Sequence, residues 1–60
     1  MEMFTIQISD PSCGWVNIRN VIDALGGGGN LRDQMEEVQR SFPDRRVRAV
    51  DKKGRFVGAP

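Results

Sequence analysis

The side chains best suited to recognition in this sequence are basic, and most of them lie near its end. Residues 40–60 hold seven of the nine basic residues and two acidic ones, a net charge of +5, whereas residues 1–39 carry −4. The seven are Arg40, Arg45, Arg46, Arg48, Lys52, Lys53 and Arg55. Guanidinium and ammonium groups at this density bind phosphates or carboxylates.

The net charge of the whole chain weakens the interpretation that this segment binds nucleic-acid phosphates. A net charge of +1 is far below that of a typical nucleic-acid-binding domain. The basic segment therefore also suits an acidic protein surface or the acidic half of a second copy. A third possibility is that these side chains only solubilise an edge strand.

Catalysis would need groups that the sequence lacks. There is no histidine, and Cys13 is the only cysteine. A cysteine or serine nucleophile needs an activating base, and one thiol makes neither an internal disulfide nor a structural zinc site. We therefore expect no enzyme activity, no cofactor and no metal site, with Cys13 as a reduced turn residue of a cytoplasmic protein.

Two further patterns are weaker signals of chemistry. Gly26–Gly29 precedes an expected helix N-terminus, where backbone N–H groups can hold an anion, but the lysine and hydroxyl residue of a phosphate-binding loop are missing. A flexible connector is the favoured interpretation. Asp33 and Glu37, one helical turn apart, provide far fewer oxygens than the about six to eight that calcium takes, which favours a solvated helix face.

Length and composition predict one small folded domain covering residues 1–60. Apolar residues make up 38% and charged residues 28% of the chain, and no apolar run reaches the roughly 20 residues of a membrane span. A core of this size supplies only about 3–5 kcal/mol of stability. Dimerisation or partner binding is the remaining source of additional stability.

The first half of the sequence predicts a hairpin. Residues 4–8 alternate apolar and polar, as in a half-buried strand, and residues 15–19 form a second strand after a turn-rich loop of about five or six residues. Residues 18–25 are ambiguous because Ile18, Val21, Ile22 and Leu25 have helical spacing. We expect strand at the start of this stretch, followed by a loop or a single helical turn.

The second half predicts a helix and another hairpin. Leu31, Met35, Val38 and Phe42 form one apolar stripe at helical spacing, with Asn30 as the N-cap and Pro43 ending the helix near residues 41–42. Strands over 45–50 and 55–57 flank a turn with aspartate first and glycine fourth. The expected fold is a small α+β domain, a single-layer antiparallel sheet of ββαββ order packed by one helix.

One helix covers one face of such a sheet and leaves the other face open, and strand alternation predicts which side chains lie on each. Toward the helix we expect Phe4, Ile6, Ile8, Val16, Ile18, Val47, Ala49 and Val57. Away from it we expect Thr5, Gln7, Trp15, Asn17, Arg19, Arg46, Arg48, Val50 and Phe56. A one-residue slip would invert the last hairpin, and the alternative for Trp15 and Phe56 is the core.

Aromatic and arginine side chains on one open face are typical of a binding surface. The sequence favours a non-enzymatic small protein-binding module, an inhibitor or accessory protein of the kind that phages and mobile elements carry, which docks on an acidic surface. The expected partner-binding residues are Trp15, Arg19, Arg46, Arg48, Lys53, Arg55 and Phe56. The alternatives are nucleic-acid binding by the same face and a homodimer that buries it.

Overall fold

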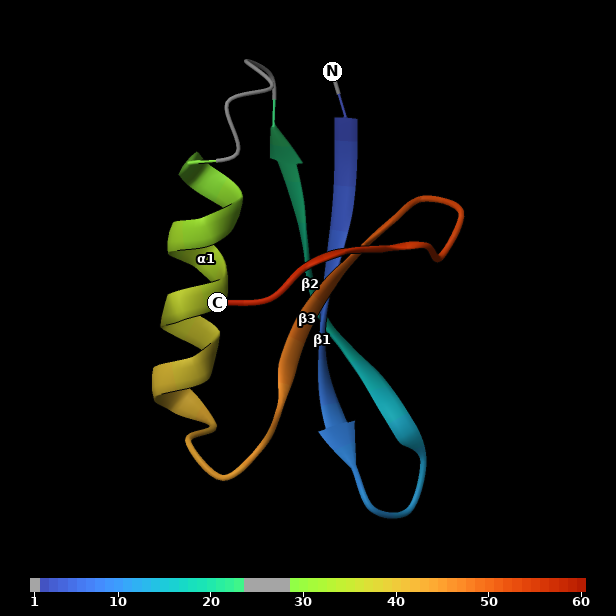
Figure 1. Cartoon of the computed structure of the whole chain (residues 1–60), viewed down its shortest axis with the longest axis vertical. Helices are drawn as coiled ribbons and strands as arrows, with labels where there is room; N and C mark the ends of the chain where they lie inside the picture. Colours follow the sequence, from blue (N-terminus) through green and yellow to red (C-terminus); the bar gives the residue numbers. More distant parts are fainter. Residues whose placement is uncertain (1, 24–28) are drawn as a thin grey trace.

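The computed structural model of the chain describes residues 2–23 and 29–60. The described residues form β1 (Glu2–Asp10), β2 (Gly14–Asp23), α1 (Gly29–Ser41), β3 (Val47–Asp51) and β4 (Phe56–Gly58). The four strands form one antiparallel sheet in the order β2-β1-β3-β4, and α1 lies along one face of it (Figure 1). The predicted α+β fold with ββαββ order is confirmed.

β1 is the strand around which the sheet is built, because it pairs with β2 on one edge and with β3 on the other. Its side chains alternate as the sequence predicts. Phe4, Ile6 and Ile8 are buried toward α1, and Ile6 has no exposed surface at all. Thr5 and Gln7 lie between them on the opposite face and are half-buried. Each buried aliphatic side chain contributes roughly 1.5–3 kcal/mol, a large share of the stability of so small a domain.

The helix closes the core with the apolar stripe that the sequence predicts. Leu31, Met35 and Val38 are buried against the sheet, and Phe42 packs at the edge of the same cluster. The chain leaves the helix through a turn held by Gln39, whose Nε2 donates to the carbonyl oxygens of Phe42, at 3.1 Å, and Arg45, at 2.9 Å. This side chain ties the loop after the helix back to the last helical turn, and it directs the chain into β3.

The first hairpin has a tighter connection than predicted, with three residues between the strands in place of five or six. Asp10 Oδ1 accepts hydrogen bonds from the backbone N–H groups of Ser12, at 2.7 Å, and Cys13, at 3.2 Å. Gly14 then adopts a φ of +86°, which allows it to pair directly with Asp10. The strands extend further because the aspartate side chain replaces backbone groups in closing the turn.

β2 contains a bulge that the sequence pattern does not reveal. Ile6 pairs with Arg19 and Gln7 pairs with Asn17, so Ile18 has no partner on β1. The extra residue moves Val21 to the core side, where it is buried. The strand continues to Asp23, so the loop or helical turn expected at this point is wrong for residues 20–23: the helical spacing of the apolar residues arises from a bulged strand.

The second hairpin has the predicted turn. Gly54 has a φ of +82° and donates from its N–H to the Asp51 carbonyl oxygen at 2.9 Å, as in a type I turn followed by a glycine bulge. The register of the strands does not slip, but a second bulge follows: Val50 pairs with Phe56 and Ala49 with Gly58. Val57 is the extra residue and is 43% exposed, so its predicted place in the core is wrong.

Three remaining expectations concern the connection to the helix and the membrane. Leu25 and Gly26–Gly28 lie outside the described residues, and with them most of the glycine run. The helix begins at Gly29, which places Asn30 inside its first turn and not before it as a cap. Among the described residues, no helix has the length and apolar character needed to cross a bilayer.

The left-handed conformation of Gly54 gives a stability prediction. An added Cβ at Gly54 meets no atom within 4 Å, so Gly54→Ala should cost only the backbone penalty, about 1 kcal/mol of unfolding free energy. Gly58→Ala is the matched control, because Gly58 also has open space around it but no positive φ. Urea unfolding measures both variants. Equal stability of the two would contradict the assigned turn.

The two turn aspartates give a prediction of pH dependence. The backbone N–H of Ser12 lowers the pKa of Asp10, and the backbone N–H of Arg55 lowers that of Asp51. A folded-state pKa below the unfolded one stabilises the fold above about pH 4, and this stabilisation disappears as the pH falls through the folded pKa. Unfolding free energy measured from pH 7 to pH 2 should therefore fall at the acid end. Asp10→Asn with Asp51→Asn should flatten that fall, and an unchanged acid limb would refute the assignment.

Candidate functional site

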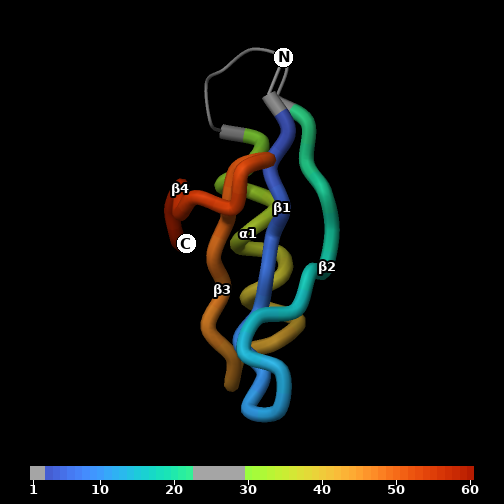
Figure 2. Tube along the Cα trace, turned by 90° about the vertical axis from the view of Figure 1, so that its right-hand side faces the viewer, coloured from blue at the N-terminus to red at the C-terminus, as the bar shows by residue number. Residues whose placement is uncertain are grey.

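The candidate site is the sheet surface opposite α1, which we call the open face. Figure 2 views it directly, with the helix behind the sheet and β2 and β4 at its two sides. Strand pairing assigns twelve side chains to it. They are Met3, Thr5, Gln7 and Ser9 of β1, Trp15, Asn17, Asn20 and Ile22 of β2, Arg46, Arg48 and Val50 at β3, and Phe56 of β4.

The centre of the open face is a stacked pair of side chains from two strands that are not neighbours. The guanidinium carbon of Arg48 lies 3.9 Å from the centroid of the Trp15 ring, above the intervening strand β1. Arg48 Nε donates to Gln7 Oε1 at 2.8 Å, and Gln7 Nε2 donates to Asn17 Oδ1 at 2.8 Å. This chain of hydrogen bonds crosses β3, β1 and β2. It fixes the guanidinium plane, whose cation–π contact contributes about 0.5–1 kcal/mol at an exposed site.

Arg46 supplies a second cation to the open face. Its backbone N–H donates to Ser9 Oγ at 3.0 Å, and its carbonyl oxygen accepts from the Ser9 N–H at 2.9 Å. The backbone therefore places Arg46 opposite Ser9, which in turn pairs with Trp15. The Arg46 side chain is exposed, and within residues 2–23 and 29–60 its guanidinium has no carboxylate partner.

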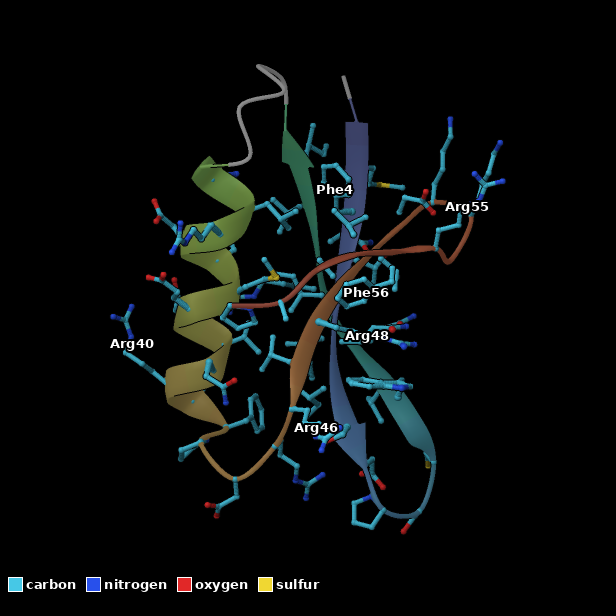
Figure 3. The ribbon with its side chains drawn as sticks, in the orientation of Figure 1. Phe4, Arg40, Arg46, Arg48, Arg55 and Phe56 are labelled. Atoms are coloured by element: carbon cyan, nitrogen blue, oxygen red, sulfur yellow. The ribbon has the colours of Figure 1, made fainter. Side chains whose placement is uncertain are left out.

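The other end of the open face is apolar. Met3 pairs with Ile22, which is 55% exposed, and Phe56 pairs with Val50 and is 65% exposed. Val50 itself is only 5% exposed because it lies between Thr5 on β1 and Phe56 on β4. The aromatic residues predicted to face outward do so, and the alternative that places both rings in the core is wrong. Figure 3 shows Phe56 and Arg48 on the side of the sheet away from α1.

Lys53 and Arg55 lie at the tip of the β3–β4 turn, beyond the strands. Their backbone N–H groups donate to Asp51 Oδ1, each at 2.9 Å, which fixes the turn and leaves both side chains exposed. The N–H of Arg55 is the main cause of the lowered pKa of Asp51, with the Lys53 N–H and both nearby positive charges acting in the same direction. The Asp51 carboxylate thus fixes the turn that carries both cations.

Arg19 is the one expected binding residue that the structure places on the wrong face for that role. Because of the bulge at Ile18, Arg19 points toward α1, where Nη1 donates to Gln34 Oε1 at 2.6 Å and lies 3.5 Å from Glu37 Oε1. Its side chain joins the helix to β2. Arg45 is also engaged: its Nη1 donates to the Ser9 carbonyl oxygen at 3.0 Å and lies 3.4 Å from Asp10 Oδ2.

Four contributors to the open face were missed from the sequence: Met3, Ser9, Asn20 and Ile22. Met3 follows from extending the alternation of β1 two residues toward the N-terminus, so that signal was present. Ile22 reaches the open face only because of the bulge, which no residue pattern in β2 indicates. The polar pair of Gln7 and Asn17 could be assigned to this face, but its part in orienting Arg48 depends on side-chain geometry.

The chemistry available on the open face is recognition of negative charge beside apolar surface. None of its twelve side chains is acidic, whereas two are arginines, and Lys53 and Arg55 lie next to it. Within the described part of the chain, no three histidine, cysteine, aspartate or glutamate side chains come together in a way that could hold a metal ion. A guanidinium held over an aromatic ring, as Arg48 is over Trp15, can still present donors to a carboxylate or a phosphate.

No family model, curated protein or solved structure matches this chain. Any proposal for its function therefore rests on the fold and on the open face.

The stacked pair can be tested through the single tryptophan of the chain. Since Arg48 covers one side of the Trp15 ring, Arg48→Ala should increase quenching of the fluorescence by acrylamide. Arg46→Ala is the matched control, because it removes an arginine from the same face without uncovering the ring. Equal quenching in wild type and Arg48→Ala would show that the two side chains are not stacked.

Proposed function

We propose that this chain is a non-enzymatic binding module of the cytoplasm, an inhibitor or accessory protein whose open face docks on an acidic surface of a protein partner. The observation that carries the proposal is a face without acidic side chains, in which Arg48 lies on Trp15 beside Arg46, an arginine with no carboxylate partner among the described residues. Tryptophan and arginine are enriched among the residues that dominate binding energy, and a face of one sign selects an oppositely charged partner.

The open face has an apolar end and a basic end, and this arrangement suits a protein partner better than a small ion. Exposed apolar side chains at one end, Met3, Ile22 and Phe56, provide area that a protein partner can bury. The arginines at the other end supply orientation and charge. Lys53 and Arg55 extend the positive field beyond the contact, where such charges mainly accelerate association.

Nucleic-acid binding by the same face is the second candidate, favoured by the same absence of acidic side chains. Two observations make it the weaker one. Arg48 already covers one side of the Trp15 ring, which reduces the surface available for stacking on a base. The number of cations on and beside the open face is small, and the chain as a whole carries only +1.

A charge reversal with a matched control tests the proposal. Arg46→Glu changes an exposed side chain whose residue is held in the sheet through backbone atoms, so the fold should remain intact. Arg40→Glu makes the same change on α1, on the far side of the helix from the sheet (Figure 3). Tagged wild type and both variants are used to capture proteins from a nuclease-treated lysate of the source organism, and captured proteins are purified for titration.

The expected result is a protein that binds wild type and Arg40→Glu alike and binds Arg46→Glu at least tenfold more weakly, a loss of about 1.4 kcal/mol. Equal binding of all three would remove the open face as the site. Retention of wild type on single-stranded or duplex DNA at low salt, with affinity falling steeply as salt rises, would support the nucleic-acid candidate instead.

A further inference from the structure

The outer edge of β2 is a long strand edge with no partner among the described residues. β2 has ten residues and borders the sheet, whereas β4 at the other border has three and is interrupted by the bulge at Val57. Figure 2 shows β2 at the side of the sheet, with α1 behind the strands and not beside them. An unpaired edge of this length is a template for strand addition, since its outward N–H and carbonyl groups lack partners in the sheet.

We propose that a second copy of this chain occupies this edge, with the two β2 strands antiparallel and the two sheets continuous across a twofold axis. The register that uses the whole strand pairs Gly14 with Asp23 of the other copy. It also pairs Trp15 with Ile22, Val16 with Val21, and Asn17 with Asn20. In this register Ile18 lies opposite Arg19 of the second copy, next to the axis.

The bulge is what makes this register self-complementary. In a strand without a bulge, residues 15 and 22 point to opposite faces, and so do residues 16 and 21. Here the extra residue Ile18 changes the alternation, so Trp15 and Ile22 share the open face while Val16 and Val21 share the core face. The pairs Trp15–Ile22, Val16–Val21 and Asn17–Asn20 therefore each bring together side chains from the same face, as antiparallel pairing requires.

The side chains on this edge favour the pairing energetically. Trp15 is 36% exposed and Ile22 more so, and each would gain an apolar neighbour on the open face. The two Arg19 side chains lie near the axis, but each is already held at its own helix by Gln34 and Glu37. Packing the open faces against each other would instead oppose four arginines with no carboxylate between them, so the edge is the better dimer interface.

This inference is independent of the proposed function, because edge pairing leaves the open face exposed in both copies. Sedimentation of the wild-type chain from micromolar to millimolar concentration should show a reversible monomer–dimer equilibrium. Asn17→Lys with Asn20→Lys places lysine opposite lysine in the dimer and should give a monomer. Asn17→Asp with Asn20→Lys is the matched control: it alters the same two side chains but places opposite charges across the interface, so it should dimerise.

A second measurement uses the wild-type sequence and therefore does not depend on whether a variant folds. The exposed Cys13 is the only cysteine and accepts a nitroxide label. In the proposed register the two Cys13 residues of the dimer are separated along the strand direction by the length of eleven residues, which is about 36 Å. Double electron–electron resonance between the two nitroxide labels should give a main distance near that length of about 36 Å. A monomer at every concentration, dimerisation that Asn17→Lys with Asn20→Lys does not weaken, or a main distance well below 36 Å would each overturn the proposal.

Discussion

The pairing of β1 on both edges is the constraint on which the rest of the molecule depends. A strand hydrogen-bonded on two sides cannot rotate, so Phe4, Ile6 and Ile8 are committed to α1, and Thr5, Gln7 and Ser9 to the opposite face. Every neighbouring side chain inherits its face from this alternation. The small core and the carboxylate-free open face are two results of the same pairing.

At the two bulges, side chains lie on other faces than regular alternation would give them. At Ile18 the bulge moves Arg19 from the open face to the helix, where it binds Gln34 and Glu37, and it brings Val21 into the core. At Val57 the bulge keeps Phe56 beside Val50 and removes Val57 from the core. A single inserted residue thus changes both packing and surface chemistry.

The sequence predicted the elements well because each has a local signal. Alternation identified β1, the apolar stripe of Leu31, Met35 and Val38 identified the helix face, and the Asp51–Gly54 pattern identified the last turn. The positions of Arg19 and Val57 were predicted wrongly because a bulge depends on how two strands fit together, and neither strand encodes it alone. Similarly, Arg48 could be placed on the open face, but its contact with Trp15 depends on side-chain orientation set by Gln7.

The most direct test of this account is to locate the indole ring of Trp15 in solution. A proton NMR spectrum of the wild-type chain should show nuclear Overhauser contacts between the ring and the Arg48 side chain. The Arg48 side-chain protons should also be shifted upfield by the ring current, because the guanidinium lies 3.9 Å from the ring centroid. Contacts from the ring to Leu31, Met35 or Val38 would place Trp15 beneath the helix and contradict the open face.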